Sequence, residues 1–385
     1  MKNKIQFSIS TRPILAILLS PLLAFSVDVP SAIQSNEVSE IQSPTNQSIV
    51  NSSALIDGEA KLVGDSESDF DSFLLGDWGH FRSTLIDNGF EFELGYIGEL
   101  SYPLVGGVQR ELALLGQLAI VANFDLGSKL DLSGWKINTV THWDHGDSPG
   151  EIVGDRLVSS NLDSADAFKL YEAYVSKSFG ERFELKAGLR DLNAEFYATD
   201  SSAVFRNSDF GIGASLSQTG ENGPSIFPTT ALALTSRFDS EDHYYFQSGI
   251  FNAVAGKPGE SGTYVNTDFR DGYLMIWETG FQHEESTNLK KLAVGYWTYT
   301  KTLSPIAESG SDIINNGVYL LLDSTIHQNL RGFTRFGWAN PLANELAASL
   351  DLGLNLSEPF SGRKNDVVGL AWRWRLRPMP VNHSA

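Results

Sequence analysis

The chain has 385 residues, of which 42% are hydrophobic and none is cysteine, and its formal net charge at pH 7 is −19. This acidity argues against nucleic acid as a partner, because nucleic-acid sites are basic. Disulfides are excluded, and no stretch approaches the roughly 18 consecutive apolar residues that a membrane-spanning helix requires.

The amino terminus has the three parts of a secretory signal. Basic residues precede a short apolar run, Ile14 to Leu23, which is followed by the small-residue site Ala24-Phe25-Ser26. We predict that residues 1–26 are a cleaved signal peptide. The alternative, a buried amphipathic helix, lacks polar positions at helical spacing. Cleavage would remove three basic and no acidic residues, which lowers the formal charge from −19 to −22.

Two further segments precede the main domain's strands. Residues 27–68 are polar, contain prolines and show no regular period, which predicts a flexible linker. Within the remaining domain, residues 69–385, apolar residues recur at helical spacing between Asp77, a capping residue, and Gly89, a stop. The pattern predicts one short amphipathic helix over about 77–87, on the periplasmic side.

From residue 90 onward the hydrophobic period is 2, which predicts strands. In the first run Phe92, Leu94 and Tyr96 alternate with Glu91 and Glu93. Twelve similar runs follow, near residues 117–126, 135–144, 168–178, 183–190, 229–238, 243–252, 273–283, 289–300, 316–326, 331–339, 345–356 and 368–376.

The strands of a soluble β-sandwich also alternate apolar and polar residues, so strand length is needed to distinguish a sandwich from a membrane barrel. These runs have about ten residues, about twice the usual soluble strand and enough to cross a bilayer at a tilt. Short turns such as residues 179–182 alternate with long excursions such as 191–228, as in membrane barrels. We therefore expect an all-β fold, a transmembrane antiparallel β-barrel.

Two sequence blocks resemble the carbohydrate-selective porin (OprB-type) family of bacterial outer membranes. The first is Gly76-Asp77-Trp78-Gly79 with the residues that follow it, namely Arg82, Leu85, Gly89, Tyr96, Gly98 and Glu99. The second and more specific block joins strand, turn, strand and loop, through Lys169-Leu170-Tyr171-Glu172-Ala173-Tyr174, Gly180, Lys186-Ala187-Gly188, Asp191-Leu192-Asn193-Ala194-Glu195-Phe196, Phe205, Asn207, Ser208, Phe210 and Gly211.

The resemblance spans roughly residues 73–370 and implies a porin of about sixteen strands that favours neutral sugars. Thirteen strands are recognisable, and the chain ends in a polar segment containing prolines rather than in a strand with a terminal aromatic residue. We expect either a barrel truncated at its carboxyl end or overlooked strands, for which residues 211–217 are the candidate.

No catalytic chemistry is expected. The pair His142 and His145 would suit a metal on a helix, but on a strand the two side chains point to opposite faces. Nucleophile elbows and phosphate-binding loops are absent from the sequence. We therefore predict no metal, no cofactor and no enzymatic activity.

A sugar channel instead needs planar hydrogen-bonding groups in a narrow, wet lumen. The predicted pore residues are the polar side chains around the second block: Glu172, Arg190, Asp191, Asn193, Glu195 and Arg206. In this hypothesis the arginines donate to sugar hydroxyls and the acids accept from them.

Two rival functions remain open. One is a non-specific diffusion porin of the same fold. The other is an outer-membrane polysaccharide hydrolase with two carboxylates, for instance Glu172 and Glu195. The expected partners of the leading hypothesis are small sugars, outer-membrane lipid and the barrel-assembly machinery, with the protein either a monomer or a homotrimer.

Overall fold

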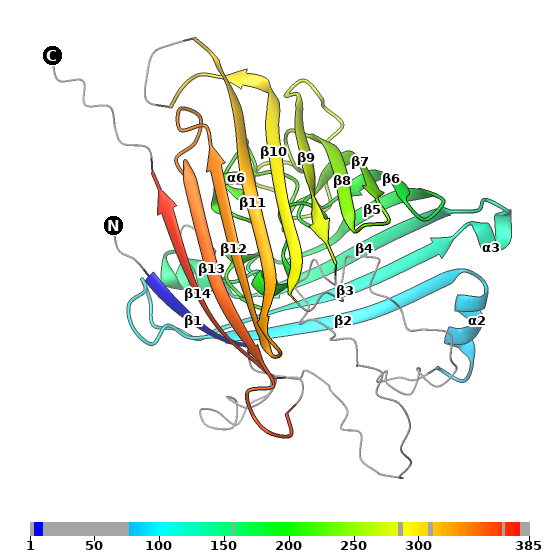
Figure 1. The fold of residues 1–385 in the computed structure, drawn as a ribbon, viewed down its shortest axis with the longest axis horizontal. Helices are drawn as coiled ribbons and strands as arrows, with labels where there is room; N and C mark the ends of the chain where they lie inside the picture. Colours follow the sequence, from blue (N-terminus) through cyan, green and yellow to red (C-terminus); the bar gives the residue numbers. More distant parts are fainter. Residues whose placement is uncertain are drawn as a thin grey trace.

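The computed structural model describes residues 4–10, 77–155, 158–283, 288–306, 311–363 and 366–377. They form one antiparallel sheet of 14 strands in the order β1-β14-β13-β12-β11-β10-β9-β8-β7-β6-β5-β4-β3-β2. From β2 to β14 each strand pairs with its neighbours in sequence, and the sheet curves around a central space (Figure 1). The antiparallel barrel-type fold is thereby confirmed.

The thirteen strands predicted from the period of 2 are all present. They are β2 (Phe90–Ser101), β3 (Ala113–Asp125), β4 (Trp135–Gly146), β5 (Ala167–Phe179), β6 (Phe183–Arg190), β7 (Ala231–Asp239), β8 (Tyr244–Asn252), β9 (Tyr273–Gln282), β10 (Leu289–Leu303), β11 (Ile313–His327), β12 (Leu330–Ala339), β13 (Ala348–Ser357) and β14 (Val367–Leu376). Their lengths, 8 to 15 residues, suit a tilted crossing of a bilayer.

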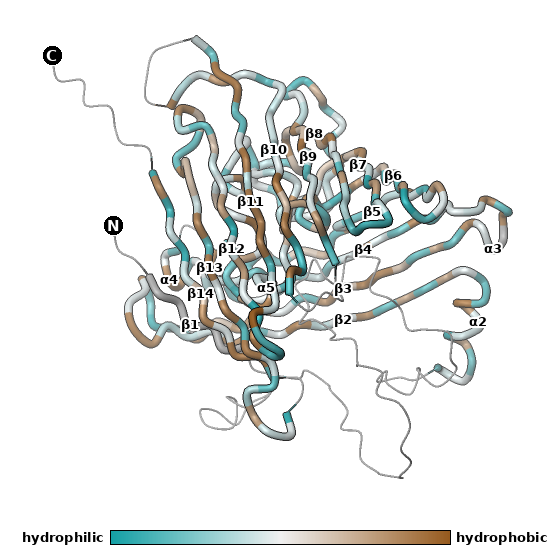
Figure 2. Tube along the Cα trace, viewed as in Figure 1, coloured by the Kyte–Doolittle hydropathy of each residue, from teal (hydrophilic) through white to brown (hydrophobic). Residues whose placement is uncertain are grey.

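Polarity across the sheet is the reverse of that in a soluble protein. On β13, Leu352, Leu354 and Leu356 are exposed on the outer face, whereas Asp351 and Asn355 are buried on the inner face. The alternation recurs along the strands, as Figure 2 shows. An apolar outside and a polar inside are what a lipid-embedded barrel requires. No helix in the described part of the chain is long and apolar enough to cross a membrane.

Closure of the barrel is not seen within the described ranges. There β2 pairs with β3 alone, and β1 (Lys4–Ser10) pairs with β14 alone. Because β1 lies in the predicted signal peptide, cleavage would leave β14 at that edge. The rest of the predicted signal peptide, the predicted linker and the carboxyl-terminal tail from residue 378 lie outside the described residues.

The predicted amphipathic helix is α2 (Phe81–Asp87), which starts later than the sequence indicated. Asp77 still caps this turn, because its carboxylate accepts from the backbone N–H and hydroxyl of Ser83 at 2.7 and 2.9 Å. Gly89 ends it with φ +77°. The helix lies at the same end of the sheet as α3 (Gly127–Leu130), where Gly89 O accepts from Asp125 N at 2.7 Å (Figure 1).

The connections alternate in length, as predicted. Residues 180–182 and 240–243 are short turns at one end, whereas 147–166, 191–230 and 253–272 are long connections at the other. The connection 147–166 carries α4 (Pro149–Val153).

We call residues 191–230 the inner segment, because they fold into the space that the sheet surrounds. The segment contains three short helices, α5 (Asp200–Ala203), η2 (Ser208–Phe210) and α6 (Ala214–Ser217). The proposed extra strand at residues 211–217 is therefore wrong, since that stretch ends in a helical turn. Apolar residues of the segment, including Phe196, Tyr197 and Leu216, pack against Trp297 and Tyr319 of the wall and form the main core.

Candidate functional site

Five of the six predicted pore residues, all but Arg206, gather where β6 ends and the inner segment begins. A β-bulge lies next to this site. The β4–β5 register shifts between Val140 and Thr141, and the bulge allows the consecutive residues Tyr171 and Glu172 both to be buried, whereas successive residues of a regular strand point to opposite faces. The bulge turns the Glu172 carboxylate to the inner face of β5, beside the end of β6.

Arg190, the last residue of β6, joins two carboxylates. Its Nη1 lies 2.9 Å from Glu172 Oε1 and its Nη2 lies 2.9 Å from Glu195 Oε1. Lys186 adds a second cation, 2.8 Å from Glu195 Oε1. The Arg190 guanidinium also stacks over the Tyr174 ring at 4.0 Å from its centroid. We call Glu172, Lys186, Arg190 and Glu195 the β6 cluster.

Asp191 and Asn193 shape the turn that leaves β6. The Asp191 backbone N–H donates to Glu172 Oε1 at 2.8 Å, and its carboxylate accepts from the Tyr171 hydroxyl at 2.5 Å and from the Asn193 N–H at 2.7 Å. The Asn193 amide in turn donates to Phe196 O at 3.1 Å. These bonds direct the chain from the strand into the lumen.

Arg206 lies apart from the other five predicted residues. It pairs with Glu99 of β2 and donates to the Ser101 hydroxyl at 3.1 Å, so it joins the inner segment to the edge of the sheet. The two arginines could not be separated from the sequence alone, because Arg190 directly precedes the inner segment and Arg206 lies within it.

Asp191 and Glu195, the two predicted pore acids in the inner segment, differ in ionisation. Burial raises the pKa of Asp191 to about 6, although the hydrogen bonds from Tyr171 and Asn193 act in the opposite direction. Burial also disfavours ionisation of Glu195, but Lys186 and Arg190 outweigh it and lower the pKa of Glu195 to about 2. Glu195 is therefore a carboxylate at neutral pH, and its charge is balanced by the two cations.

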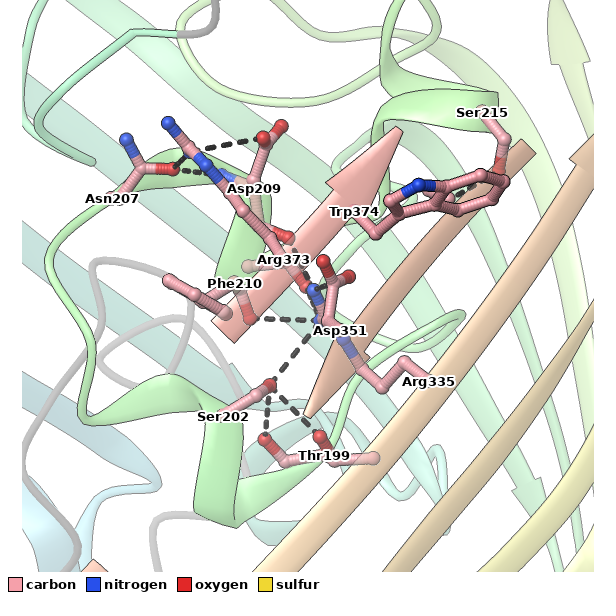
Figure 3. A network of polar contacts seen from close by, with 12 residues as sticks. Thr199, Ser202, Asn207, Asp209, Phe210, Ser215, Arg335, Asp351, Arg373 and Trp374 are labelled. Carbon is pink, nitrogen blue, oxygen red and sulfur yellow. Dashed lines mark hydrogen bonds and ion pairs between the residues drawn. The ribbon is translucent and has the colours of Figure 1, made fainter. Parts of the chain in front are cut away.

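A second polar cluster, on the opposite part of the wall, joins β12, β13 and β14 to the inner segment (Figure 3). Asp209 Oδ2 accepts from Arg373 at 3.0 Å and from Arg375 at 2.8 Å. Asp351 is shared by Arg335 at 3.1 Å and Arg375 at 2.8 Å. We call these five residues the arginine wall.

Arg335 is not among the pore residues predicted from the sequence. The signal was present in the alternation of β12, because Phe333, Arg335 and Gly337 share the inner face while Phe336 and Trp338 are exposed. An arginine at an inward position of a strand is a candidate lumen residue.

A cavity of about 1000 Å³ lies beside residues 218–221 of the inner segment, at the end of the sheet that carries the long connections. Its lining includes Glu221 of the segment, Tyr299 and Lys301 of β10, and Arg373 and Arg375 of β14. Charged groups of both signs and an aromatic ring thus line one cavity. Such groups can donate hydrogen bonds to the hydroxyls of a ligand, accept hydrogen bonds from them, and pack against its apolar face.

Comparison with known proteins agrees with this architecture. The model of the family described as "Carbohydrate-selective porin, OprB family" matches residues 109–375. Porin B of Pseudomonas aeruginosa is 31% identical over 356 residues, which cover 81% of this chain and 76% of that protein. QuiX of Acinetobacter baylyi, whose name describes it as a porin, is 27% identical over 169 residues, 40% of this chain and only 37% of its own length.

Among solved structures, the high-pH structure of Pseudomonas putida OprB superimposes with a TM-score of 0.67 over 80% of both chains, at 18% identity. At this identity the likeness concerns the fold alone. It supports a porin-type sheet for the chain.

Proposed function

The chain belongs to the carbohydrate-selective porin, OprB family, and we propose that it carries small neutral carbohydrates by passive diffusion through its lumen in the bacterial outer membrane. The observation that carries this proposal is the polar inner wall, whose acids are paired with arginine and lysine and whose Arg373 and Arg375 line a cavity of about 1000 Å³. Such a wall offers many hydrogen bonds and little uncompensated charge.

Burial separates the charged residues of the β6 cluster, together with Arg206, into two roles. Arg190 and Glu172 are 2% and 0% exposed, so we assign them to holding the wall. Arg206 is 39% exposed, Lys186 20% and Glu195 14%, so these side chains are the ones that a solute can reach. In this proposal Arg206 and Lys186 donate to sugar hydroxyls, and Glu195 accepts from them.

Neutral solutes suit such a lumen because an ion would have to compete with existing pairs. A hydroxyl can accept from Arg206 or donate to Glu195 without breaking the bonds to Glu99 or Lys186. Binding should be weak, since tight binding would slow exit from the channel.

The two rival functions make different demands. A non-specific porin would use the same residues only to set ion preference. A hydrolase with Glu172 and Glu195 would need both carboxylates at the substrate, but Glu172 is fully buried and held by Arg190. The family and its relatives are porins, which are channels, and this favours diffusion over hydrolysis.

One experiment separates the three functions. The purified protein is placed in planar bilayers, and the potassium current is measured as neutral sugars of increasing size are added, in parallel with an assay for reducing ends released from polysaccharide. We expect concentration-dependent block by sugar and no reducing ends. Current that is indifferent to every sugar would select the non-specific porin, and released reducing ends would select the hydrolase.

The finer partners stay predictions. Contact with outer-membrane lipid follows from the apolar outer face, and assembly by the barrel-assembly machinery follows from the class of protein. Crosslinking in intact membranes would decide between monomer and homotrimer.

A further inference from the structure

The inner segment is attached to the wall at several places between β11 and β13. Asp323 of β11 accepts from the N–H and hydroxyl of Ser201 at 2.8 and 2.6 Å. Asn355 of β13 donates to Ser201 O, and the hydroxyls of Ser215 and Ser349 lie 3.2 Å apart. The segment is therefore held by specific bonds along the strands, not only by apolar packing.

Arg335 makes the most extensive of these attachments, as Figure 3 shows. It is fully buried on the inner face of β12. Its Nη1 donates to Phe210 O at 2.8 Å, to Gly211 O at 2.7 Å and to the Ser202 hydroxyl at 3.2 Å, and its Nη2 donates to Asp209 O. One side chain thus satisfies three consecutive carbonyl oxygens that end η2.

The wall around Arg335 is shaped to receive the segment. Gly337, the next inward residue of β12, has no room for a side chain: a Cβ there would lie 2.0 Å from the Ser215 hydroxyl and 2.6 Å from the Tyr197 hydroxyl. At Gly369 of β14 a Cβ would lie 2.7 Å from the Phe205 ring. Inward glycines at these two positions allow close approach of the segment.

The position of the segment also bounds the solute path. Its residues 218–221 line the same cavity as Arg373 and Arg375, and these two arginines form ion pairs with Asp209 of the segment. If the segment moved away from the wall, the cavity would change its cross-section. The attachment at Arg335 and the width of the passage are therefore linked through one continuous piece of chain.

We propose that Arg335 is a positioning residue that sets the width of the pore by holding the inner segment against the β12–β14 wall, without touching solute itself. The inference rests on the proposed function, because it concerns the passage through which the sugar moves. Arginine suits the role because its planar group can donate to several carbonyl oxygens at once, whereas lysine offers a single nitrogen.

The first test replaces this donor. In Arg335→Gln the Asp351 carboxylate keeps Arg375 as a partner at 2.8 Å, so no buried charge is orphaned and the barrel should still assemble. We expect single-channel conductance to rise by about twofold and larger neutral oligosaccharides to enter liposomes, because both follow the open cross-section. A merely structural role would lower yield and leave conductance unchanged. The matched control is Arg182→Gln in the exposed turn between β5 and β6.

A second test makes the attachment reversible. The chain has no cysteine, so Ser215→Cys with Ser349→Cys would give a single engineered disulfide across hydroxyls that now lie 3.2 Å apart. In the Arg335→Gln background the oxidised protein should show wild-type conductance, and reduction in the bilayer should widen the same channel. If the Arg335→Gln protein assembles poorly, the variant that also carries the two cysteines can be assembled with its disulfide formed, and the disulfide can be reduced afterwards in the bilayer.

Unchanged conductance and sugar cut-off in Arg335→Gln, or no change on reducing the crosslinked channel, would overturn the inference. Failure of the proposed function looks different, because the wild-type channel would then conduct ions without any block by sugar. The two outcomes are measured independently on the same bilayers.

Discussion

Replacing Arg190 by methionine should destabilise the protein strongly, because it leaves a buried carboxylate without its cation. Glu172 is 0% exposed and lies 2.9 Å from the Arg190 guanidinium. After the substitution its remaining contact is the Asp191 N–H at 2.8 Å. Glu195 is less affected, since Lys186 still lies 2.8 Å away. The damage should therefore be concentrated on Glu172.

At a pH at which Glu172 is ionised, the expected magnitude is the cost of an uncompensated buried charge, about 3–5 kcal/mol. At about 1.4 kcal/mol for each factor of ten, the folding equilibrium would fall by roughly two to three and a half orders of magnitude. The double variant Arg190→Met with Glu172→Gln should recover most of this loss. The glutamine is neutral, yet its oxygen can still accept from the Asp191 N–H, so no charge and no backbone donor is left unsatisfied.

The assay is urea unfolding of the protein folded into phospholipid vesicles, followed by tryptophan fluorescence and by the shift in electrophoretic mobility on heating. The single variant, the double variant and Glu172→Gln alone complete the cycle. If the double variant were as unstable as Arg190→Met alone, the cost would come from lost packing on Tyr174, and the charge argument would be wrong.

Three further outcomes are expected. Leu352→Arg on the lipid face should cost about 2–4 kcal/mol in the same unfolding assay, whereas Glu181→Arg in an exposed turn should cost little; equal losses would mean that the strand's faces are misassigned. Arg206→Ala should weaken sugar block of the current and shift the reversal potential toward cation preference, because Glu99 loses its cation and, among the described residues, keeps only the hydrogen bond from Ser160; an unchanged reversal potential and block would remove Arg206 from the solute path. Amino-terminal sequencing of the outer-membrane protein should begin near Val27, and retention of Met1 would contradict the predicted signal peptide.

The strands could be predicted from sequence because their signal is local. Alternation of Leu352, Leu354 and Leu356 with polar residues fixes both the period and the outward face of β13 without reference to any other strand. The first residue of α2 was harder to predict than the strands. Asp77 accepts from the backbone N–H of Ser83 inside the helix, although it does not stand directly before the helix. Local propensity identifies the element better than its boundary.

Contacts of the inner segment could not be predicted, because they join residues that are distant in sequence. Arg335 and Phe210 are 125 positions apart, and Arg206 and Glu99 are 107 apart. A period of 2 places Arg335 on the inner face but does not say which backbone atoms will meet it. The segment also uses short helical turns, so its carbonyl groups need partners that a strand ladder would have supplied, and only the folded wall provides them.

The distribution of charge across the lumen follows from these long-range contacts and not from the net charge. In the arginine wall, Asp209 and Asp351 are shared among three arginines, and Asp155 lies 4.0 Å from Arg373, so three acids balance three cations. At the β6 cluster, Lys186 and Arg190 meet Glu172 and Glu195, with Glu184 a further 3.2 Å from Lys186, which leaves an excess of negative charge. Five strands separate the two groups, and the inner segment contacts both. A formal charge of −19 therefore need not make the passage cation-selective, because most acids of both groups are paired with arginine or lysine, while a hydroxyl still finds donors and acceptors in each group.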